Sequence, residues 1–249
     1  MTPERLRAAL RGVPDPEWLD AAIERVAAEP ATVARFFAAA ARRCGRGPLP
    51  DAPGWTADEA ARALLLAALP ADHAGHAGDV YRHGDAAEKR AVLRALPLLP
   101  IGAECEPLLH DAIRTNDTRL IAAALGPYSR HLDADAWRQA VLKCVFTGVP
   151  LAVVHDLDAR ADAGLAAMLG GFAAERRAAG REVPADAAAL LDRLTATTSP
   201  ATNTTASPAT NTTASPAANT AGSPAASSVA SSVASPVADP AVPSDARKA

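Results

Sequence analysis

Helix-start signals followed by short apolar segments recur along the first 194 residues of this chain. Thr56-x-x-Glu59 and Asp85-x-x-Glu88 have the form of capping boxes, in which each side chain accepts a hydrogen bond from a free backbone N–H group at the helix start. Glycine or proline follows most of these segments and ends the helix. The signals predict helices that begin near residues 3, 16, 32, 56, 85, 107, 116, 133, 158 and 184.

The same sequence argues against a β-fold. No segment alternates apolar and polar residues between turn signals, and β-branched residues are sparse. Roughly a quarter of the chain is alanine, the strongest helix former. We therefore expect an all-α fold, in which short antiparallel helices stack as a HEAT-like solenoid or as an irregular helical bundle. One long helix is expected over 158–179, weakened at Gly170-Gly171, and two short ones over 107–114 and 116–125.

The composition changes sharply after Leu194. Residues 195–249 contain no aromatic residue, and the sequence SPATNTTA at 199–206 is repeated at 207–214. Proline in each repeat interrupts helices and sheets, and the small polar side chains offer little apolar area to bury. We expect an all-helical domain over 1–194 and a disordered tail rich in Ser, Pro, Ala and Thr over 195–249.

Charge and apolar patterning exclude several classes of protein. The 25 basic and 28 acidic residues give a net charge of −3, which shows no bias towards nucleic acid. The longest uncharged stretches, 144–154 and 163–174, are shorter than the roughly 18–20 residues of a membrane span. The N-terminus lacks the apolar run of a secretory signal. Cys44, Cys105 and Cys144 are too few for a disulfide framework, so we expect a cytoplasmic protein with buried thiols, no transmembrane segment and no nucleic-acid partner.

Common enzyme signatures are missing from the sequence. It has no P-loop, no dinucleotide-binding glycine motif, no HExxH and no GxSxG, so we predict no catalytic residue and no cofactor. The one histidine-rich group is His73, His76, Asp79 and His83, which fall within about 120° of a helical wheel if 71–83 is one helix. Such a face has the chemistry of a zinc site, but two glycines weaken the helix and favour a solvated polar face. A metal site here stays an open alternative.

A second candidate site is the segment from Arg114 to Arg119. We expect Asn116 to cap the following helix and Asp117 to lie in its positively polarised first turn. Arg114 and Arg119 flank that helix start, where free backbone N–H groups suit an anion. The sequence therefore predicts a ligand or partner site at these four residues, although helix capping alone also explains Asn116 and Asp117.

The third candidate site lies on the helix expected after residue 133. Trp137 belongs to an apolar stripe, and Arg138 follows it. Gln139 and Lys143 lie on the opposite side of the helix, where they form either a solvated face or the polar wall of a pocket. We include all four among the candidate ligand or partner residues.

Charged residues also gather near position 160. Asp156, Asp158 and Asp162 surround Arg160, and their spacing does not match that of a calcium-binding loop. We expect these four residues to form an exposed local ion-pair cluster of little energetic value.

Several long segments of the chain form a recognisable set. They are YRHGDAAEKRAVLRALPLLP at 81–100, RTNDTRLIAAALGPY at 114–128, WRQAVLKCVFTGVPL at 137–151, RAD at 160–162 with AAM at 166–168, and ERRAAGREVP at 175–184. Together these segments resemble the EboA family. The likeness covers most of 1–194 and excludes the tail, and the segments contain no known chemical signature.

The resemblance implies a role in moving a secondary-metabolite precursor towards the periplasm. EboA-like proteins are encoded beside a UbiA-like membrane prenyltransferase and other enzymes, and proteins of that gene cluster are the implied partners. We therefore expect a non-enzymatic helical adaptor or carrier for a small apolar metabolite, located in the cytoplasm and recruited to the inner membrane by a partner. The alternative is a metal-dependent hydrolase or isomerase of the same pathway.

Overall fold

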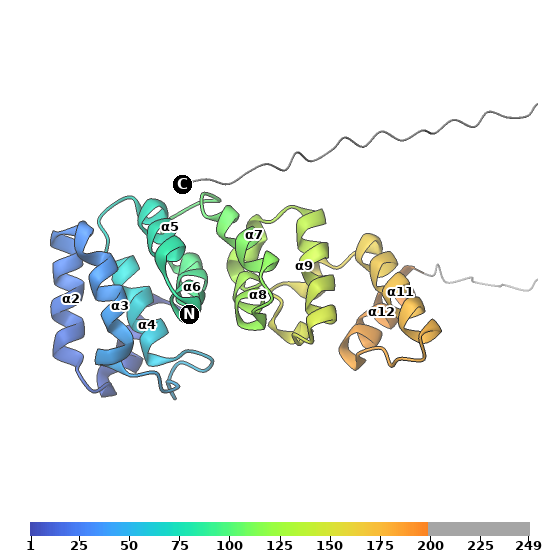
Figure 1. The fold of residues 1–249 in the computed structure, drawn as a ribbon, viewed down its shortest axis with the longest axis horizontal. Coiled ribbons are helices and arrows are strands. Elements are labelled where there is room, and N and C mark those ends of the chain that lie inside the picture. The colour runs from blue at the N-terminus through green and yellow to red at the C-terminus, as the bar shows by residue number, and fades with distance from the viewer. Residues whose placement is uncertain (199–249) are drawn as a thin grey trace, which may run out of the picture. The chain divides into compact units, whose positions relative to one another are not determined.

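The computed structural model describes residues 1–198, and these residues fold almost entirely into helices (Figure 1). The described part contains no strand, and its only β feature is an isolated bridge between Pro48 and Thr56. The prediction of an all-α fold is confirmed. Most of the tail expected over 195–249 lies outside the described residues.

The α-helices of the described residues are short, and five 3-10 turns lie between them. The α-helices are α1 (Pro3–Ala9), α2 (Pro16–Ala28), α3 (Val33–Cys44), α4 (Ala57–Ala67), α5 (His73–His83), α6 (Ala86–Ala95), α7 (Glu106–Arg114), α8 (Thr118–Ala124), α9 (Ala134–Thr147), α10 (Leu157–Arg160), α11 (Ala163–Ala178) and α12 (Ala185–Thr198). The 3-10 turns are η1 (Leu10–Gly12), η2 (Pro30–Thr32), η3 (Leu96–Leu98), η4 (Pro127–His131) and η5 (Leu151–Val153).

The capping signals read from the sequence work as expected. Both predicted capping boxes form, at the starts of α4 and α6. The Asp133 carboxylate accepts a hydrogen bond from the backbone N–H of Ala136 at 2.7 Å and caps α9. Gly148 ends α9 with φ +74°, a left-handed conformation that glycine adopts without a steric penalty.

The prediction of one long helix over 158–179 is wrong. The chain forms α10 and α11 instead, because Ala161 and Asp162 adopt extended backbone conformations between them. Asp162 then caps α11 by accepting from the backbone N–H of Leu165 at 3.0 Å. The Gly170-Gly171 pair, expected to weaken the helix, lies inside α11 without interrupting it.

Consecutive helices pack against one another in chain order (Figure 1). Helices α2, α3, α4, α6, α8 and α9 each contact the next in that series, while α5 packs on α6 and α7 on α8. Their apolar stripes share one core cluster that extends from Leu6 to Leu190. Stacking of this kind fits the predicted solenoid, and the HEAT-like label stays a prediction.

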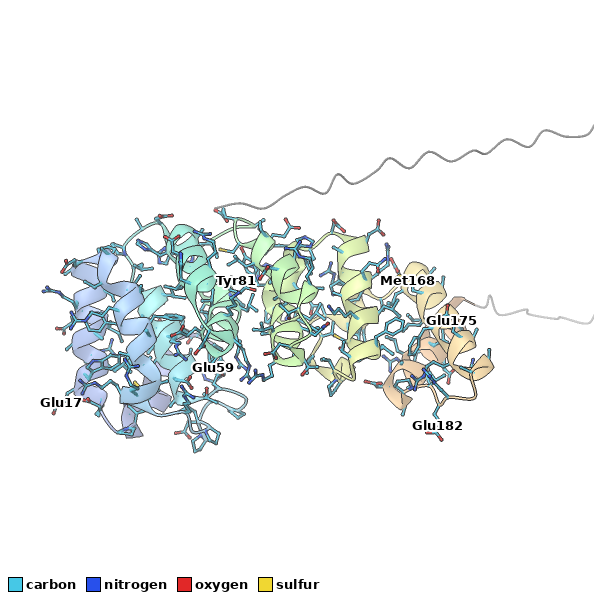
Figure 2. All side chains as sticks on the ribbon, viewed as in Figure 1. Glu17, Glu59, Tyr81, Met168, Glu175 and Glu182 are labelled. Carbon is cyan, nitrogen blue, oxygen red and sulfur yellow. The ribbon has the colours of Figure 1, made fainter. Side chains whose placement is uncertain are left out.

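A few charged side chains lie inside this core. Asp58, Glu59 and Arg62 on α4 are all buried. Figure 2 shows Glu59 among the helices, whereas Glu17 and Glu182 are exposed. Arg62 donates to the Asp58 carboxylate at 2.6 Å and to the backbone carbonyl of Phe37 at 3.1 Å. Burial of these ions is tolerated because each finds a partner of opposite charge or a carbonyl.

The three cysteines are buried free thiols, as predicted. Burial raises the pKa of Cys44 and Cys105 to about 11 and that of Cys144 to about 12. Thiols with such pKa values are protonated at neutral pH and are poor nucleophiles. A search of the described residues finds no helix with the length and apolar character needed to cross a membrane.

Candidate binding cavity

A cavity in the described residues lies between α6, α8 and the C-terminal end of α9. Its volume is about 870 Å³, which is within the usual range for a small-molecule site. Apolar side chains form much of its wall, and the other notable feature is a set of arginines. The main apolar contributors are Trp55, Leu93, Leu98, Pro127, Val149 and Val153.

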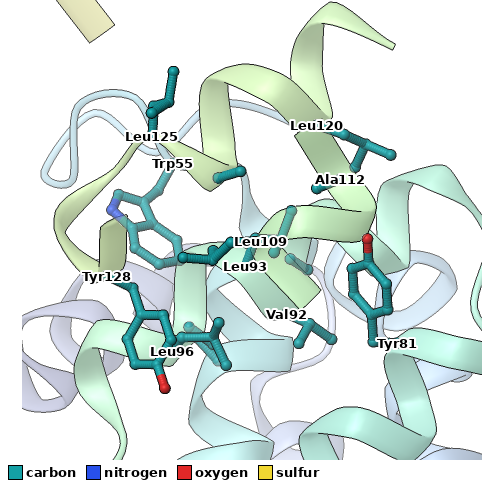
Figure 3. Packing of buried hydrophobic residues seen from close by; sticks show 14 of the residues in the cluster. Trp55, Tyr81, Val92, Leu93, Leu96, Leu109, Ala112, Leu120, Leu125 and Tyr128 are labelled. Atoms are coloured by element: carbon teal, nitrogen blue, oxygen red, sulfur yellow. The ribbon is translucent and has the colours of Figure 1, made fainter. Parts of the chain in front are cut away.

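Trp55 reaches this cavity from the loop between α3 and α4. The loop ends in a turn in which the backbone N–H of Trp55 donates to the carbonyl of Ala52 at 3.0 Å. Pro53 and Gly54 occupy the centre of the turn, and Gly54 has φ +81°, the combination that a type II turn requires. A second bond, from the Leu49 N–H to the Trp55 carbonyl at 2.9 Å, fixes the residue. Figure 3 shows its ring beside Leu93 of α6.

Two arginines of α6 face the cavity from adjacent turns of the helix. Arg90 and Arg94 are four residues apart, which places them on one helical face. Both pair with the buried Glu59 of α4, with N–O distances of 2.9 Å from Arg90 and 3.7 Å from Arg94. The residue predicted as half of a capping box therefore also holds two cavity-lining cations.

Arg94 is the more enclosed of the two. Its guanidinium carbon lies 4.3 Å from the centre of the Trp55 ring, a cation–π arrangement that orients the group. Its buried Nε has no hydrogen-bond partner. Burial lowers the pKa of Arg94, while the nearby Glu59 acts in the opposite direction. The side chain still carries its charge, because the ordinary arginine pKa is far above neutrality.

Arg119 is the one residue of the second sequence candidate that lines the cavity. Its guanidinium makes two hydrogen bonds to the Asp117 carboxylate, at 3.0 and 2.7 Å, and this pairing lowers the pKa of Asp117. The prediction that Asn116 caps this helix is wrong. The helix begins at Thr118, so Asp117 is the cap and accepts from the backbone N–H of Arg119. Arg114 is exposed and lies 3.7 Å from Asp111.

Arg130 enters the cavity wall from η4. The neighbouring Tyr128 fixes this turn, because its hydroxyl donates to the Gly102 carbonyl at 2.6 Å and accepts from the Cys105 N–H at 3.2 Å. Burial raises the pKa of Tyr128, so the hydroxyl remains a donor at neutral pH. Among residues 1–198, no side chain forms an ion pair or hydrogen bond with the Arg130 guanidinium.

The third sequence candidate lies outside the cavity. Trp137 is buried in the core, and Gln139 is exposed on the other side of α9. Arg138 is bound to Asp162, with its Nη2 at 2.6 Å from the carboxylate. Lys143 donates to carbonyls at the C-terminal end of α7, at 2.5 and 2.7 Å, which stabilises that helix end. The structure gives Trp137, Arg138 and Lys143 packing or bonding partners within the fold, whereas Gln139 is exposed.

The prediction of an ion-pair cluster at Arg160 is wrong. Its guanidinium donates to the backbone carbonyls of Ser129 and Leu132 at 2.7 and 2.9 Å, and it lies over the Trp137 ring. The surrounding aspartates pair elsewhere, as Asp162 does with Arg138 and Asp158 with Arg193. The interruption between α10 and α11 places Asp162 at the start of α11, where it binds Arg138.

The histidine-rich group does form one helix, α5, as the wheel assumed. Asp79 pairs with Arg82, and His83 approaches the backbone carbonyl of Asp79 at 2.9 Å. Within residues 1–198, no three His, Cys, Asp or Glu side chains are grouped so that they could hold a metal ion. The histidines of α5 also lie away from the cavity, whose wall contains no histidine.

Sequence reasoning missed most of the cavity. The sequence shows that Arg90 and Arg94 lie four positions apart in the segment after the second capping box. It gives no sign that Glu59 on another helix is their partner. Arg130 sits after a Gly-Pro turn with no motif around it. Of the three, Arg94 alone carries a signal in the sequence, because no acidic residue lies within five positions of it on either side.

Comparison with known proteins gives one match. The family model for metabolite traffic protein EboA matches residues 38–192. That range contains every cavity residue named above. No curated protein and no solved structure matches the chain.

Proposed function

Because the chain belongs to the EboA family of metabolite traffic proteins, we propose that it is a non-enzymatic carrier that holds a small apolar metabolite in the cavity between α6, α8 and α9. The observation that carries the proposal is the cavity itself. It is large enough for such a ligand, and it lies within the part of the chain that the family model matches.

The side chains that line the cavity support binding rather than chemistry. They include four arginines and two threonines, and they include no histidine, cysteine, serine, lysine or carboxylate. A nucleophile paired with a general base, the usual arrangement for covalent or acid–base catalysis, is therefore not formed by these residues. Arginine at neutral pH donates hydrogen bonds and positive charge but does not exchange protons.

The setting that we propose for this carrier rests on the resemblance to the family. We propose that it takes a secondary-metabolite precursor on its way to the periplasm from enzymes of the same gene cluster. A UbiA-like membrane prenyltransferase is the partner that would bring the protein from the cytoplasm to the inner membrane. Affinity purification of the full chain from its native host should recover products of that cluster, and their absence would remove the adaptor part of the proposal.

Binding of an apolar molecule can be tested with the neutral dye N-phenyl-1-naphthylamine, whose fluorescence rises in apolar surroundings. We expect saturable binding to the full chain. Val153 lines the cavity and is partly exposed, so Val153→Trp should fill the entrance without disturbing the core. The dissociation constant should rise about tenfold, which corresponds to a loss of about 1.4 kcal/mol.

Ala152 provides the matched control. It is the preceding residue in η5 and is exposed, and it lines a different hollow. Ala152→Trp adds the same indole to the same turn, so its dye affinity should stay at the wild-type value. Absence of dye binding by the wild type, or equal affinities for both tryptophan variants, would exclude the cavity as the carrier site.

A further inference from the structure

The cavity carries a positive charge that the chain as a whole does not. The protein has more acidic than basic residues, yet the residues lining the cavity include Arg90, Arg94, Arg119 and Arg130 and no carboxylate. Such a local excess of one sign attracts a ligand of the other sign, because apolar walls screen the field less than water does.

Two carboxylates that do not line the cavity neutralise part of this charge. Glu59 is shared by Arg90 and Arg94, and Asp117 pairs with Arg119. Arg130 has no paired carboxylate among residues 1–198. Four guanidinium groups and two carboxylates leave a surplus of two positive charges, which matches a dianion better than a single carboxylate.

Part of the apolar wall lies deeper in the cavity than two of its arginines. Leu93 and Trp55 are 1% and 7% exposed, so they form its inner wall. The Arg119 side chain is 63% exposed, and Arg130 is exposed as well, which places both at the opening. A ligand that satisfies both regions has an aliphatic body that points inward and a charged group at the mouth.

All the charged side chains that line the cavity are arginines, which narrows the choice of the ligand's charged group. A guanidinium is planar and offers parallel N–H donors that match two oxygens of one phosphate, whereas a lysine acts as a point charge.

We propose that the cavity selects an amphiphile with an aliphatic chain and a phosphate or diphosphate head, the chain lying against Trp55 and Leu93 and the head against the arginines. This inference rests on the proposed carrier function and names its ligand class. It predicts that the aliphatic chain and the phosphate head of the ligand each contribute to affinity. A neutral molecule of the same length therefore binds more weakly, and a free phosphate ion binds more weakly still.

Calorimetric titration of the full-length protein with four probes tests the proposed ligand class. The probes are dodecyl phosphate and dodecanol, both kept below their aggregation limits, inorganic phosphate, and phosphatidylcholine vesicles that contain phosphatidic acid. We expect dodecyl phosphate to bind at least about tenfold more tightly than dodecanol, as a charge-assisted arginine–phosphate contact implies. Inorganic phosphate and vesicles should give no comparable binding.

Two arginine variants locate the head group. Arg130→Gln should weaken dodecyl phosphate about tenfold and leave dodecanol within about twofold, since one charged hydrogen-bonded contact is lost. Arg114→Gln is the matched control, because Arg114 is also exposed and lies outside the cavity wall. Its affinity for both probes should equal that of the wild type.

The outcomes separate the two proposals. Equal affinity for dodecyl phosphate and dodecanol, or no effect of Arg130→Gln, overturns the phosphate head while the carrier proposal stands. If inorganic phosphate binds as tightly as the amphiphile, the proposed role of the aliphatic chain is overturned. If the protein binds only to vesicles, the proposal of a site for single molecules is overturned. If dodecyl phosphate, dodecanol and the neutral naphthylamine dye all fail to bind, the carrier proposal itself is wrong.

Discussion

Individual charged residues decide how the N-terminal half of the described core is held together. Arg62 is 2% exposed and lies between Asp58, the Phe37 carbonyl and, at 3.5 Å, Glu88. The fold tolerates a buried cation of this kind because its partners compensate the charge. Its removal leaves a buried carboxylate uncompensated, which costs more than the pair itself contributes.

We predict that Arg62→Met lowers the free energy of unfolding by about 3–5 kcal/mol, the usual cost of breaking a buried ion pair. Methionine keeps most of the volume but none of the donors, so Asp58 remains buried without its cation. Urea denaturation followed by circular dichroism measures the change.

The control is an ion pair with the same spacing on the surface. Arg25 and Glu29 also lie four residues apart, at 3.0 Å, but their side chains are 63% and 54% exposed. Arg25→Met should therefore change stability by no more than about 1 kcal/mol. Similar losses for both variants would mean that burial does not control the value of these pairs.

The partners of such residues could not be predicted from the sequence. Thr56-x-x-Glu59 was recognised as a capping box because both residues belong to one helical turn. The bonds from Glu59 to Arg90 and Arg94 depend on how α4 packs against α6, about thirty positions further along the chain. Likewise, a wheel placed Lys143 on a polar face but gave no sign that α7 would present its carbonyls there.

At the scale of the helix, caps define where each element starts. Asp162 accepts from the Leu165 N–H at the start of α11 and is bound by Arg138 of α9, so it fixes both the helix start and its position. The hydrogen bond from Arg138, with the backbone bonds, lowers the pKa of Asp162 to about 2. The carboxylate therefore stabilises the fold in its ionised form.

The pH dependence follows from the sign of this shift. A carboxylate whose pKa is lower in the folded state contributes stability above its unfolded pKa of about 3.9 and loses it as the pH falls through the folded value. Wild type should therefore be more stable than Asp162→Asn at neutral pH. The difference in unfolding free energy should shrink between about pH 4 and pH 2. Because the side chain is 43% exposed, solvent reduces the size of the effect.

A second variant separates charge from capping. Asparagine still caps a helix well, whereas alanine does not, so Asp162→Ala should be less stable than Asp162→Asn by about 1 kcal/mol at every pH. Urea titrations of the three proteins between pH 2 and pH 7 give the differences. A gap between wild type and Asp162→Asn that stays constant down to pH 2 would contradict the ion-pair explanation.

Helix starts were more predictable than helix interruptions. The starts at Thr2, Asp15, Thr56, Asp85 and Asp133 were correct because a short polar side chain bonds the backbone of its own first turn, which is a local event. The break before Asp162 was missed because the same residue is also compatible with a helix interior. Its bond to Arg138 on another helix favours the extended conformation.

At the scale of the whole molecule, the cavity collects residues from widely separated segments. Trp55, Leu93, Arg130 and Val153 come from four elements or loops, and only packing brings them together. Sequence patterns predicted the fold class, since amphipathic periodicity and caps are properties of single segments. They did not predict the cavity, which depends on the space left where α6, α8 and α9 meet.

The sequence also predicts that the repeats after residue 198 add nothing to the folded part. The core cluster of the described residues ends at Leu190, and the repeats offer proline and small polar side chains with little apolar area. We therefore expect a chain ending at Thr198 to melt within about 2 °C of the full chain, less than the shift expected for a change of 1 kcal/mol. It should also bind the neutral dye with unchanged affinity. Scanning calorimetry and the dye titration measure the two properties, and a lower melting temperature with weaker dye binding would show that the repeats stabilise the cavity.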